Sequence, residues 1–586
     1  MANRIENQSK DQLDSRSERN ERLIVYQFFP RILTNTRENP EPWGSLERNG
    51  SGKFNDLTPK LLRGLKSLGL NTLWLTGVIE HATKTDFSAY GIEPDHPAVL
   101  KGEAGSPYAI KDYYDVNPAL AVDIDRRLDE FRNAVKRIHK EGLKVVIDFV
   151  PNHTARRYHS DKAPEGISDF GATDDTTCFY KRDNNYYYIP NQLFSPAINL
   201  MAEKGPYVEF PAKATGNDCF SAFCGENDWY ETVKLNYGRD YGDGSEHYEP
   251  VPDTWLKMLH ILRYWASLGV DGFRCDMVFM VPLPFWNWVI PQVKRDYPGV
   301  FFIGEIYDIG LYRPFLEYGH FDYLYDKVNL YDTLVGIERH NVSAARLTDC
   351  WKAVDGIGDS MLNFLENHDE VRFASTEFAG DPARVVPYLV VSAMMSRGPY
   401  LIYYGQELGE RGEENEGFAG HNHRTTIFDY WSLDTLRRWY AGGNPGVSKL
   451  TQHEKWLREL YTRALHLCND NDALREGGFF DLMYVNLQNP DFDPHSIYCW
   501  LRYHGDEVLL LVANFSREER RIKVNIPDLA FEMAGIKEGE FTTEDLLWGN
   551  RHKITLRKGV PVALQTGASD ALIIPLKAIE KPLNPK

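Results

Sequence analysis

Eight short apolar runs, set between stretches of amphipathic helical pattern, constrain the fold of this chain more than any other feature. An apolar run, a helix and a further apolar run are typical of βα units around a parallel sheet. Residues 57–70 and 128–143 have such helical spacing before the second and third runs. Eight parallel strands with helices between them predict the α/β class and a closed (β/α)₈ TIM barrel. The runs are LIVYQFF, NTLWLTG, LKVVIDFV, VDGFRCDM, VFFIGEI, FDYLYD, MLNFLEN and PYLIYYG.

Two interruptions of this alternation predict further domains. Roughly 100 residues rich in Tyr, Asn, Asp and Gly follow the third run, far more than an ordinary loop, so we expect a small inserted domain after strand 3. Near the C-terminus the apolar period changes to two, which is typical of an antiparallel β-sandwich domain. The predicted parts are a polar N-terminal arm (1–22), the barrel (23–154 and 231–470), the inserted domain (155–230) and the C-terminal sandwich (471–586).

Charge and cysteine content limit the partners and the compartment. The 66 basic and 84 acidic residues give a net charge of −18, which argues against nucleic acid or an anionic membrane as partner. Seven cysteines without a CxxC pair are typical of reduced thiols. The polar start has no apolar signal core, so we expect a cytoplasmic protein, or a periplasmic one if a signal was trimmed. The oligomeric state stays open.

Charged side chains follow several of the predicted strands. Asp276 and Glu305 stand at the ends of the fourth and fifth runs, and Asp369 follows the seventh. Reacting groups of such barrels lie at the C-terminal ends of the strands, so these carboxylates should converge on one rim. Any one of these carboxylates alone would be interpreted as a structural residue. The set favours a catalytic site.

Converging carboxylates suit the cleavage of an acetal. One carboxylate attacks the anomeric carbon, and a second protonates the leaving oxygen and later activates water. A guanidinium beside the nucleophile should keep it ionised, and a carboxylate-rich setting should raise the pKa of the acid. Metal-assisted hydrolysis is the competing use of such residues. No HExxH motif supports it.

The segments DFVPNHT, GFRCDMV, GEIYD and FLENHDEVR resemble, in order, the four signature regions of the α-amylase family of retaining glycoside hydrolases. The resemblance covers about residues 23–586. It implies that Asp276 is the nucleophile, Glu305 the general acid/base and Asp369 a ligand of the sugar in subsite −1. It implies further substrate-binding residues, namely the aromatic platform Tyr108, the hydroxyl-binding His153 and His368, and Arg274 as partner of the nucleophile.

This resemblance implies a carbohydrate substrate and a retaining hydrolase that cleaves α-1,4-glucosidic bonds of starch-like glucans or maltooligosaccharides. Transglycosylation or isomerisation, as in glucanotransferases or trehalose synthases, is the alternative on the same site. A non-catalytic sugar-binding protein is a remote third alternative, since all three carboxylates are present. The segment TVKLN (232–236) is closer to the MPKLN type of neopullulanases and maltogenic enzymes than to the QPDLN type of oligo-1,6-glucosidases.

One departure from the family pattern concerns the residues after the nucleophile. Met277 to Met280 stand where many family amylases have a small residue, then x-Lys-His. The acceptor side should therefore be more apolar. The change also removes a His whose backbone helps to hold a structural Ca²⁺ in calcium-dependent relatives, while Asn152 matches another ligand of that ion. We expect no required cofactor and leave a structural Ca²⁺ on Asn152 open.

Overall fold

A closed barrel of eight parallel strands forms the centre of the molecule, as predicted. The computed structural model describes residues 22–203 and 205–578, so the predicted N-terminal arm lies outside the described residues except for Arg22. The strands follow one another around the barrel in the order β1-β2-β5-β12-β13-β14-β15-β16, and β16 pairs with β1 to close it. Their bounds are β1 Ile24–Phe28, β2 Thr72–Leu75, β5 Lys144–Phe149, β12 Gly272–Cys275, β13 Phe301–Gly304, β14 Tyr323–Tyr325, β15 Met361–Phe364 and β16 Tyr400–Tyr403.

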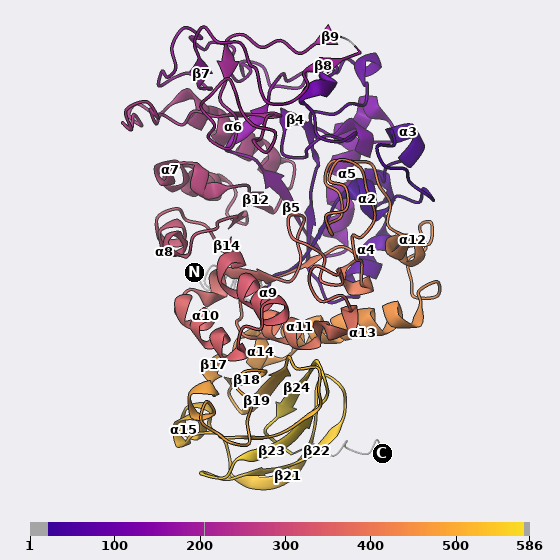
Figure 1. The fold of residues 1–586 in the computed structure, drawn as a ribbon, viewed down its shortest axis with the longest axis vertical. Coiled ribbons are helices and arrows are strands. Elements are labelled where there is room, and N and C mark those ends of the chain that lie inside the picture. Colours follow the sequence, from indigo (N-terminus) through magenta and orange to yellow (C-terminus); the bar gives the residue numbers. More distant parts are fainter. Residues whose placement is uncertain (1–21, 204, 579–586) are drawn as a thin grey trace, which may run out of the picture.

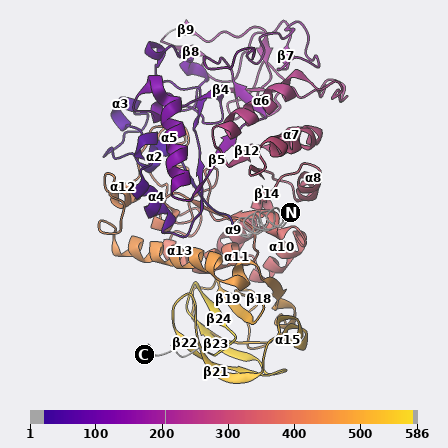
Figure 2. The ribbon, with the colours of Figure 1, turned by 180° about the vertical axis from the view of Figure 1, so that it is seen from behind.

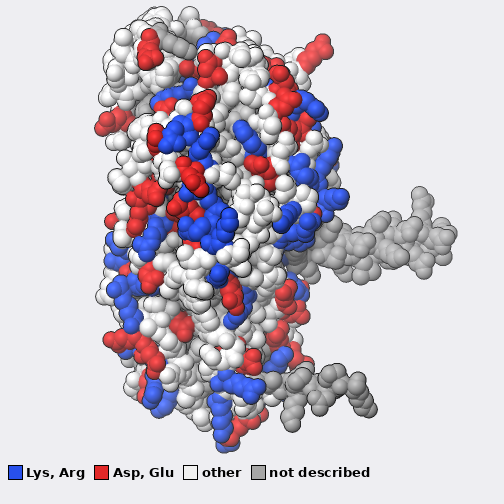
Figure 3. Space-filling model, turned by 90° about the vertical axis from the view of Figure 1, so that its right-hand side faces the viewer, with Lys and Arg blue, Asp and Glu red and all other residues white. Residues whose placement is uncertain are grey.

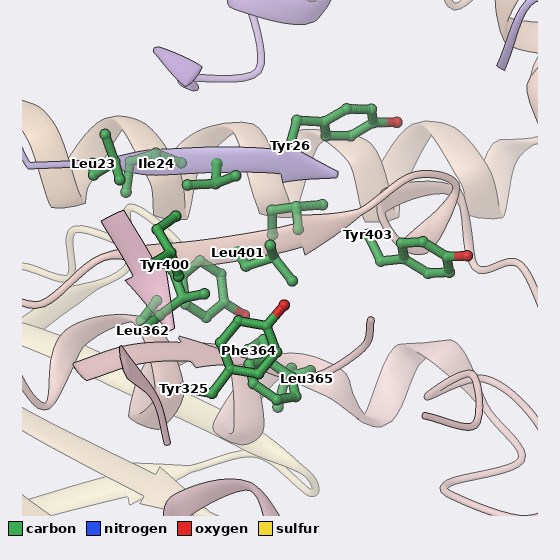
Figure 4. Packing of buried hydrophobic residues seen from close by; sticks show 14 of the residues in the cluster. Leu23, Ile24, Tyr26, Tyr325, Leu362, Phe364, Leu365, Tyr400, Leu401 and Tyr403 are labelled. Atoms are coloured by element: carbon green, nitrogen blue, oxygen red, sulfur yellow. The ribbon is translucent and has the colours of Figure 1, made fainter. Parts of the chain in front are cut away.

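Large apolar side chains fill this barrel and its surroundings. Figure 4 shows Tyr26 on β1, Tyr325 on β14, Phe364 on β15 and Leu401 on β16 within one buried cluster. Strands that are buried on both faces read as nearly continuous apolar runs, which is why the sequence pattern located all eight.

Helices lie around the outside of the barrel (Figure 1). Helix α4 begins after Thr58, whose side chain accepts a hydrogen bond from the Leu61 N–H, and α13 begins with a capping box of Thr451 and Glu454. The longer helices are α4 Pro59–Lys66, α5 Arg127–Lys140, α6 Asp253–Ser267, α7 Leu283–Asp296, α8 Ile309–Glu317, α9 Asp332–Arg339, α10 Leu347–Ala353, α11 Val385–Met394, α12 Asp434–Tyr440 and α13 Gln452–Asp470. The short ones are α2 Pro30–Leu33, α3 Leu46–Asn49 and α14 Asp472–Arg475.

The segment between β5 and α6 has short strands and a small core of its own. Strand β11 pairs with β6 in antiparallel register, so that Lys234 lies opposite His153. Phe194 and Tyr230 belong to the separate cluster of buried side chains in this segment. Figures 1 and 2 show this segment at the end of the molecule remote from the C-terminal sheets. Its strands are β6 His153–Ala155, β7 Tyr188–Ile189, β8 Met201–Ala202, β9 Gly205–Pro206, β10 Ala212–Lys213 and β11 Thr232–Lys234, and the hairpin β3 Ile79–His81 with β4 Ile110–Val116 precedes it in the chain.

The C-terminal region is built from antiparallel sheets. A four-stranded sheet has the order β17-β18-β19-β24, and β20 pairs with β23 and β21 with β22. The alternation of buried and exposed residues on β23 shows the period of two on which the prediction rested. The bounds are β17 Gly478–Asp481, β18 Ile497–His504, β19 Glu507–Asn514, β20 Arg520–Val524, β21 Gly539–Glu544, β22 Arg551–Leu556, β23 Val562–Thr566 and β24 Asp570–Pro575, with α15 Asp528–Ala534 between β20 and β21.

The outer surface carries charges of both signs. Figure 3 shows basic and acidic side chains interspersed over one face of the molecule. Within residues 22–203 and 205–578, no helix has both the length and the apolar character that a membrane crossing requires.

Candidate active site

One buried guanidinium joins three carboxyl groups at the C-terminal ends of neighbouring strands. Arg274 lies on β12 opposite Asp148 on β5, and β13 on the other side ends just before Glu305. The Nη1 atom of Arg274 lies 2.8 Å from Asp276 Oδ1 and 3.3 Å from Asp148 Oδ1. Its Nη2 atom lies 2.8 Å from Glu305 Oε2. Barrel topology therefore brings Asp276, Glu305 and Arg274 together.

This cluster has more acids than cations, which affects its protonation. Burial, and next the charge of Glu305, raise the pKa of Asp276 well above its ordinary value, although Arg274 acts in the opposite direction. Burial also raises the pKa of Asp148. Arg274 lowers the pKa of Asp276, which is the direction expected from the sequence, while burial and the charge of Glu305 act against it.

Two donors fix the carboxyl group of Glu305. The Met277 N–H donates to Oε2 at 2.8 Å and the Tyr307 hydroxyl donates to Oε1 at 2.5 Å. Met277 has φ of 45°, a left-handed conformation that is uncommon outside glycine. Such backbone geometry is often found at functional sites. The turn directly after Asp276 therefore contacts the carboxyl group of Glu305 through the Met277 N–H.

Tyr108, His368 and Asp369 form a second group of contacts next to this cluster, with the Arg274 guanidinium 5.4 Å from the centre of the Tyr108 ring. The Tyr108 hydroxyl lies 2.6 Å from His368 Nε2, and their rings stack at 5.2 Å. Asp369 Oδ2 lies 2.9 Å from the same nitrogen. Burial alone would raise the pKa of Asp369, but the charge of His368 and its hydrogen bond lower it to about 2. Asp369 is therefore ionised at neutral pH and can accept hydrogen bonds from sugar hydroxyls.

His153 lies at the start of β6 beside an aromatic ring. Its ring centre is 5.3 Å from that of Trp229. Burial, and then the charge of Lys234, lower the pKa of His153 to about 3. A neutral imidazole can both donate and accept, which suits a ligand of hydroxyl groups.

A cavity of about 490 Å³ lies above these residues. Five of the residues predicted from the sequence line it, namely Tyr108, His153, Asp276, Glu305 and Asp369. Arg274 and His368 are buried behind them. The sequence reasoning missed several lining residues outside the eight runs, among them Lys101, Trp229, Glu231, Tyr307, Lys327, Ile427 and Phe428. Of these, only Tyr307 had a signal, because it stands two residues after Glu305.

The surroundings of Asn152 do not fit a calcium ion. Its Oδ1 atom accepts a hydrogen bond of 2.5 Å from the ammonium of Lys234. The same ammonium lies 2.6 Å from Asp218 Oδ1 and 3.0 Å from the Met280 carbonyl oxygen. Ca²⁺ needs six to eight oxygen ligands, and here the oxygens face a lysine. The expectation of a metal ligand at Asn152 is therefore not supported.

Comparison with known proteins adds independent information. The family model described as "Alpha amylase, catalytic domain" matches residues 27–466. A cyclomaltodextrin glucanotransferase of Geobacillus stearothermophilus is 24% identical over 461 residues, which cover 74% of this chain and 56% of that protein. A cyclomaltodextrinase of Thermoanaerobacter pseudethanolicus is 22% identical over 511 residues, 85% of this chain and 71% of that one. The chain thus spans little more than half the length of the glucanotransferase.

Solved structures show the same fold. The maltogenic α-amylase AmyB of Thermotoga neapolitana superposes with a TM-score of 0.60 at 20% identity, covering 94% of this chain and 98% of that one. The α-amylase of Geobacillus thermoleovorans, solved with acarbose, has a TM-score of 0.60 at 18% identity and coverages of 96% and 99%. At these identities the likeness concerns the fold alone.

Proposed function

This chain belongs to the α-amylase family of glycoside hydrolases, and we propose that it is a retaining enzyme that cleaves α-1,4-glucosidic bonds of starch-like glucans or maltooligosaccharides. The observation that carries the proposal is the shared guanidinium, since Arg274 holds Asp276 and Glu305 each at 2.8 Å beside one cavity. Two carboxyl groups flanking a glycosidic bond are what glycoside hydrolysis requires.

In the first step Asp276 attacks the anomeric carbon and displaces the leaving sugar. Glu305 gives its proton to the departing glycosidic oxygen, and a covalent β-glycosyl ester forms on Asp276. In the second step Glu305 takes a proton from water, whose oxygen attacks the anomeric carbon and releases Asp276. Two displacements retain the α-configuration.

The other side chains of the cavity orient the sugar. The ring of Tyr108 offers a stacking face, and the ionised Asp369 with the neutral His153 binds hydroxyl groups. Hydrogen bonds that strengthen as the sugar ring flattens lower the barrier more than they tighten substrate binding. Arg274 stabilises the negative charge of Asp276 as it leaves in the second step.

A second candidate, transglycosylation, is favoured by the apolar residues after Asp276. Phe279 packs near Tyr307, with ring centres 6.2 Å apart, close to Glu305. An apolar acceptor side lowers the local access of water and allows a second sugar to capture the ester. One of the relatives is named a glucanotransferase, which is the name of an enzyme that transfers glucan chains in this way.

One experiment separates these candidates. Maltoheptaose is incubated with the enzyme, and products are followed by chromatography together with the number of reducing ends. Hydrolysis gives shorter chains and a steady gain of reducing ends. Longer or cyclic chains, or trehalose, without that gain would establish the transferase or isomerase reading. Binding of maltooligosaccharides without formation of any product would instead indicate a non-catalytic sugar-binding protein.

A further inference from the structure

Lys234 is a buried cation at the junction of three parts of the chain. Its side chain is 2% exposed. Asn152 follows barrel strand β5, Asp218 lies in the inserted segment, and Met280 ends the turn after β12. The ammonium lies within 3.0 Å of one oxygen from each of them. It therefore links these three parts at one point.

We propose that the Lys234 ammonium takes the place of a structural calcium ion and positions the catalytic residues on both sides of it. The family resemblance puts Asn152 and the residue at Met280 among the ligands of that ion. In this chain both of their oxygens contact Lys234 instead. The cation at this place is therefore a side chain of the protein and not a bound ion.

Charge balance supports a lysine at this place. An ammonium has three N–H donors, and three oxygens surround it. Asp218 supplies one negative charge, while the other two oxygens are neutral, so the set balances one positive charge. A divalent ion would leave an excess of buried positive charge, which is costly. In residues 22–203 and 205–578 the only group of three side chains suited to a metal is Glu80, Asp115 and Asp161, which does not include these residues.

The contacts of Lys234 lead directly to the catalytic groups. Asn152 Nδ2 lies 3.1 Å from His153 Nδ1 and donates to the Gly216 carbonyl at 2.7 Å, so its amide orients the histidine ring. On the other side, Met280 belongs to the turn in which Val278 N–H donates to the Glu305 carbonyl oxygen at 3.1 Å. Lys234 is thus a positioning residue for His153 and for the turn that contacts Glu305.

The first test replaces Lys234 by the neutral Lys234→Met, with Lys213→Met as control. Lys213 is another largely buried lysine of the inserted segment, and it donates to the Arg156 carbonyl. We expect both variants to lower Tm. Only Lys234→Met should lower kcat, about tenfold with little change in KM, because the catalytic groups lose their alignment. Wild-type kcat in Lys234→Met would overturn the proposal.

The second test restores a metal site. Lys234→Asp adds a carboxylate to the oxygens of Asn152, Asp218 and Met280, and water molecules can complete the six to eight oxygen ligands that Ca²⁺ needs. Calorimetry should then detect one Ca²⁺ bound at this position, with a rise in Tm and at least a fivefold gain in kcat. The wild-type enzyme should show neither effect, and its kcat should resist chelators. Loss of wild-type kcat on chelation, restored by Ca²⁺, would contradict the proposal.

A milder variant covers the case in which both substitutions at Lys234 prevent folding. Asp218 is 32% exposed at its side chain, so Asp218→Asn should fold. It leaves the ammonium without its anion, and we expect a lower Tm and a severalfold lower kcat. Unchanged values would count against the proposal. The activity readouts rest on the proposed function, whereas Ca²⁺ calorimetry on Lys234→Asp, together with the rise in its Tm on adding Ca²⁺, decides on Lys234 even if glucans are not cleaved.

Discussion

The hydroxyl group of Tyr307 donates a 2.5 Å hydrogen bond to Glu305 Oε1, and the Met277 N–H holds the other oxygen of the same carboxyl. Both oxygens of the proposed acid/base are therefore fixed before any substrate binds. Proton transfer depends on the direction in which this carboxyl points, so the Tyr307 hydroxyl contributes to the rate through Glu305.

Tyr307→Phe keeps the ring beside Phe279 and removes the donor. We expect kcat on maltooligosaccharides to fall about tenfold while KM stays within about twofold. The loss should be smaller on a nitrophenyl glycoside, whose leaving group needs less protonation. Tyr400→Phe is the control, because it removes a buried hydroxyl that bonds Ser392 away from the cavity. Equal losses on both substrates would show that Tyr307 does not act through Glu305.

The two carboxyl groups should respond differently to removal. Asp276→Asn should lower kcat on the order of 10⁴-fold or more on every substrate, because no covalent ester can form. Glu305→Ala should retain the first step on a substrate with a good leaving group, and added azide should displace Asp276 from the β-glycosyl ester with inversion, which gives an α-glycosyl azide. Nuclear magnetic resonance identifies that product. A β-glycosyl azide from Glu305→Ala would reverse the two assignments, because it forms by direct displacement when the nucleophile is missing.

The barrel and the positions of its strand ends could be predicted from the sequence because they depend on local pattern. A strand buried on both faces is apolar throughout, and the residue after it lies at the rim by topology. Asp276 and Glu305 follow from that rule. The electrostatics of these residues does not follow from it, because the direction in which the pKa of Asp276 shifts depends first on burial and then on the charge of Glu305.

The residues from the inserted segment were beyond such reasoning. Trp229 and Lys234 belong to a segment without a regular apolar period, so no pattern indicates where their side chains lie. Their positions depend on the pairing of β11 with β6, in which Lys234 lies opposite His153. The resemblance directed attention to Asn152 as a metal ligand. Only the fold shows that an ammonium, whose residue is 82 positions away in the chain, contacts it.

A buried carboxyl cluster away from the cavity predicts how stability depends on pH. Burial, and next the charges of Asp112 and Asp115, raise the pKa of Glu80 well above its ordinary value. Burial and Asp115 raise the pKa of Asp112 to about 7. A raised pKa in the folded state means that folding is favoured while the group is protonated. Stability should therefore fall as the pH rises from about 4 through 7.

Glu80→Gln removes one of these charges. We expect its Tm to exceed that of the wild type by roughly 2–4 °C at pH 8, with the difference vanishing near pH 4. Thermal unfolding measured at several pH values checks this. Glu165→Gln, on an exposed residue of the inserted segment, should match the wild type throughout. A Glu80→Gln protein that is less stable at pH 8 would show that the ionised carboxylate stabilises the fold.

The ion pair of Lys101 and Glu231 should influence how the enzyme holds the sugar chain. The two side chains meet at 2.9 Å in the lining of the cavity. Within the described part of the chain, Glu231 Oε2 is buried and has no hydrogen-bond partner, so it can accept from a sugar hydroxyl.

Glu231→Gln replaces an anionic acceptor by an amide, and a charged acceptor contributes roughly 1.5–3 kcal/mol. We expect KM for maltotetraose and longer chains to rise about tenfold with kcat nearly unchanged, because this group is not among those proposed to act on the reacting bond. Lys84→Met breaks an ion pair with Glu103 that is not part of the cavity lining, and it should leave both constants unchanged. A fall in kcat without a change in KM for Glu231→Gln would instead mean that the pair acts on the transition state.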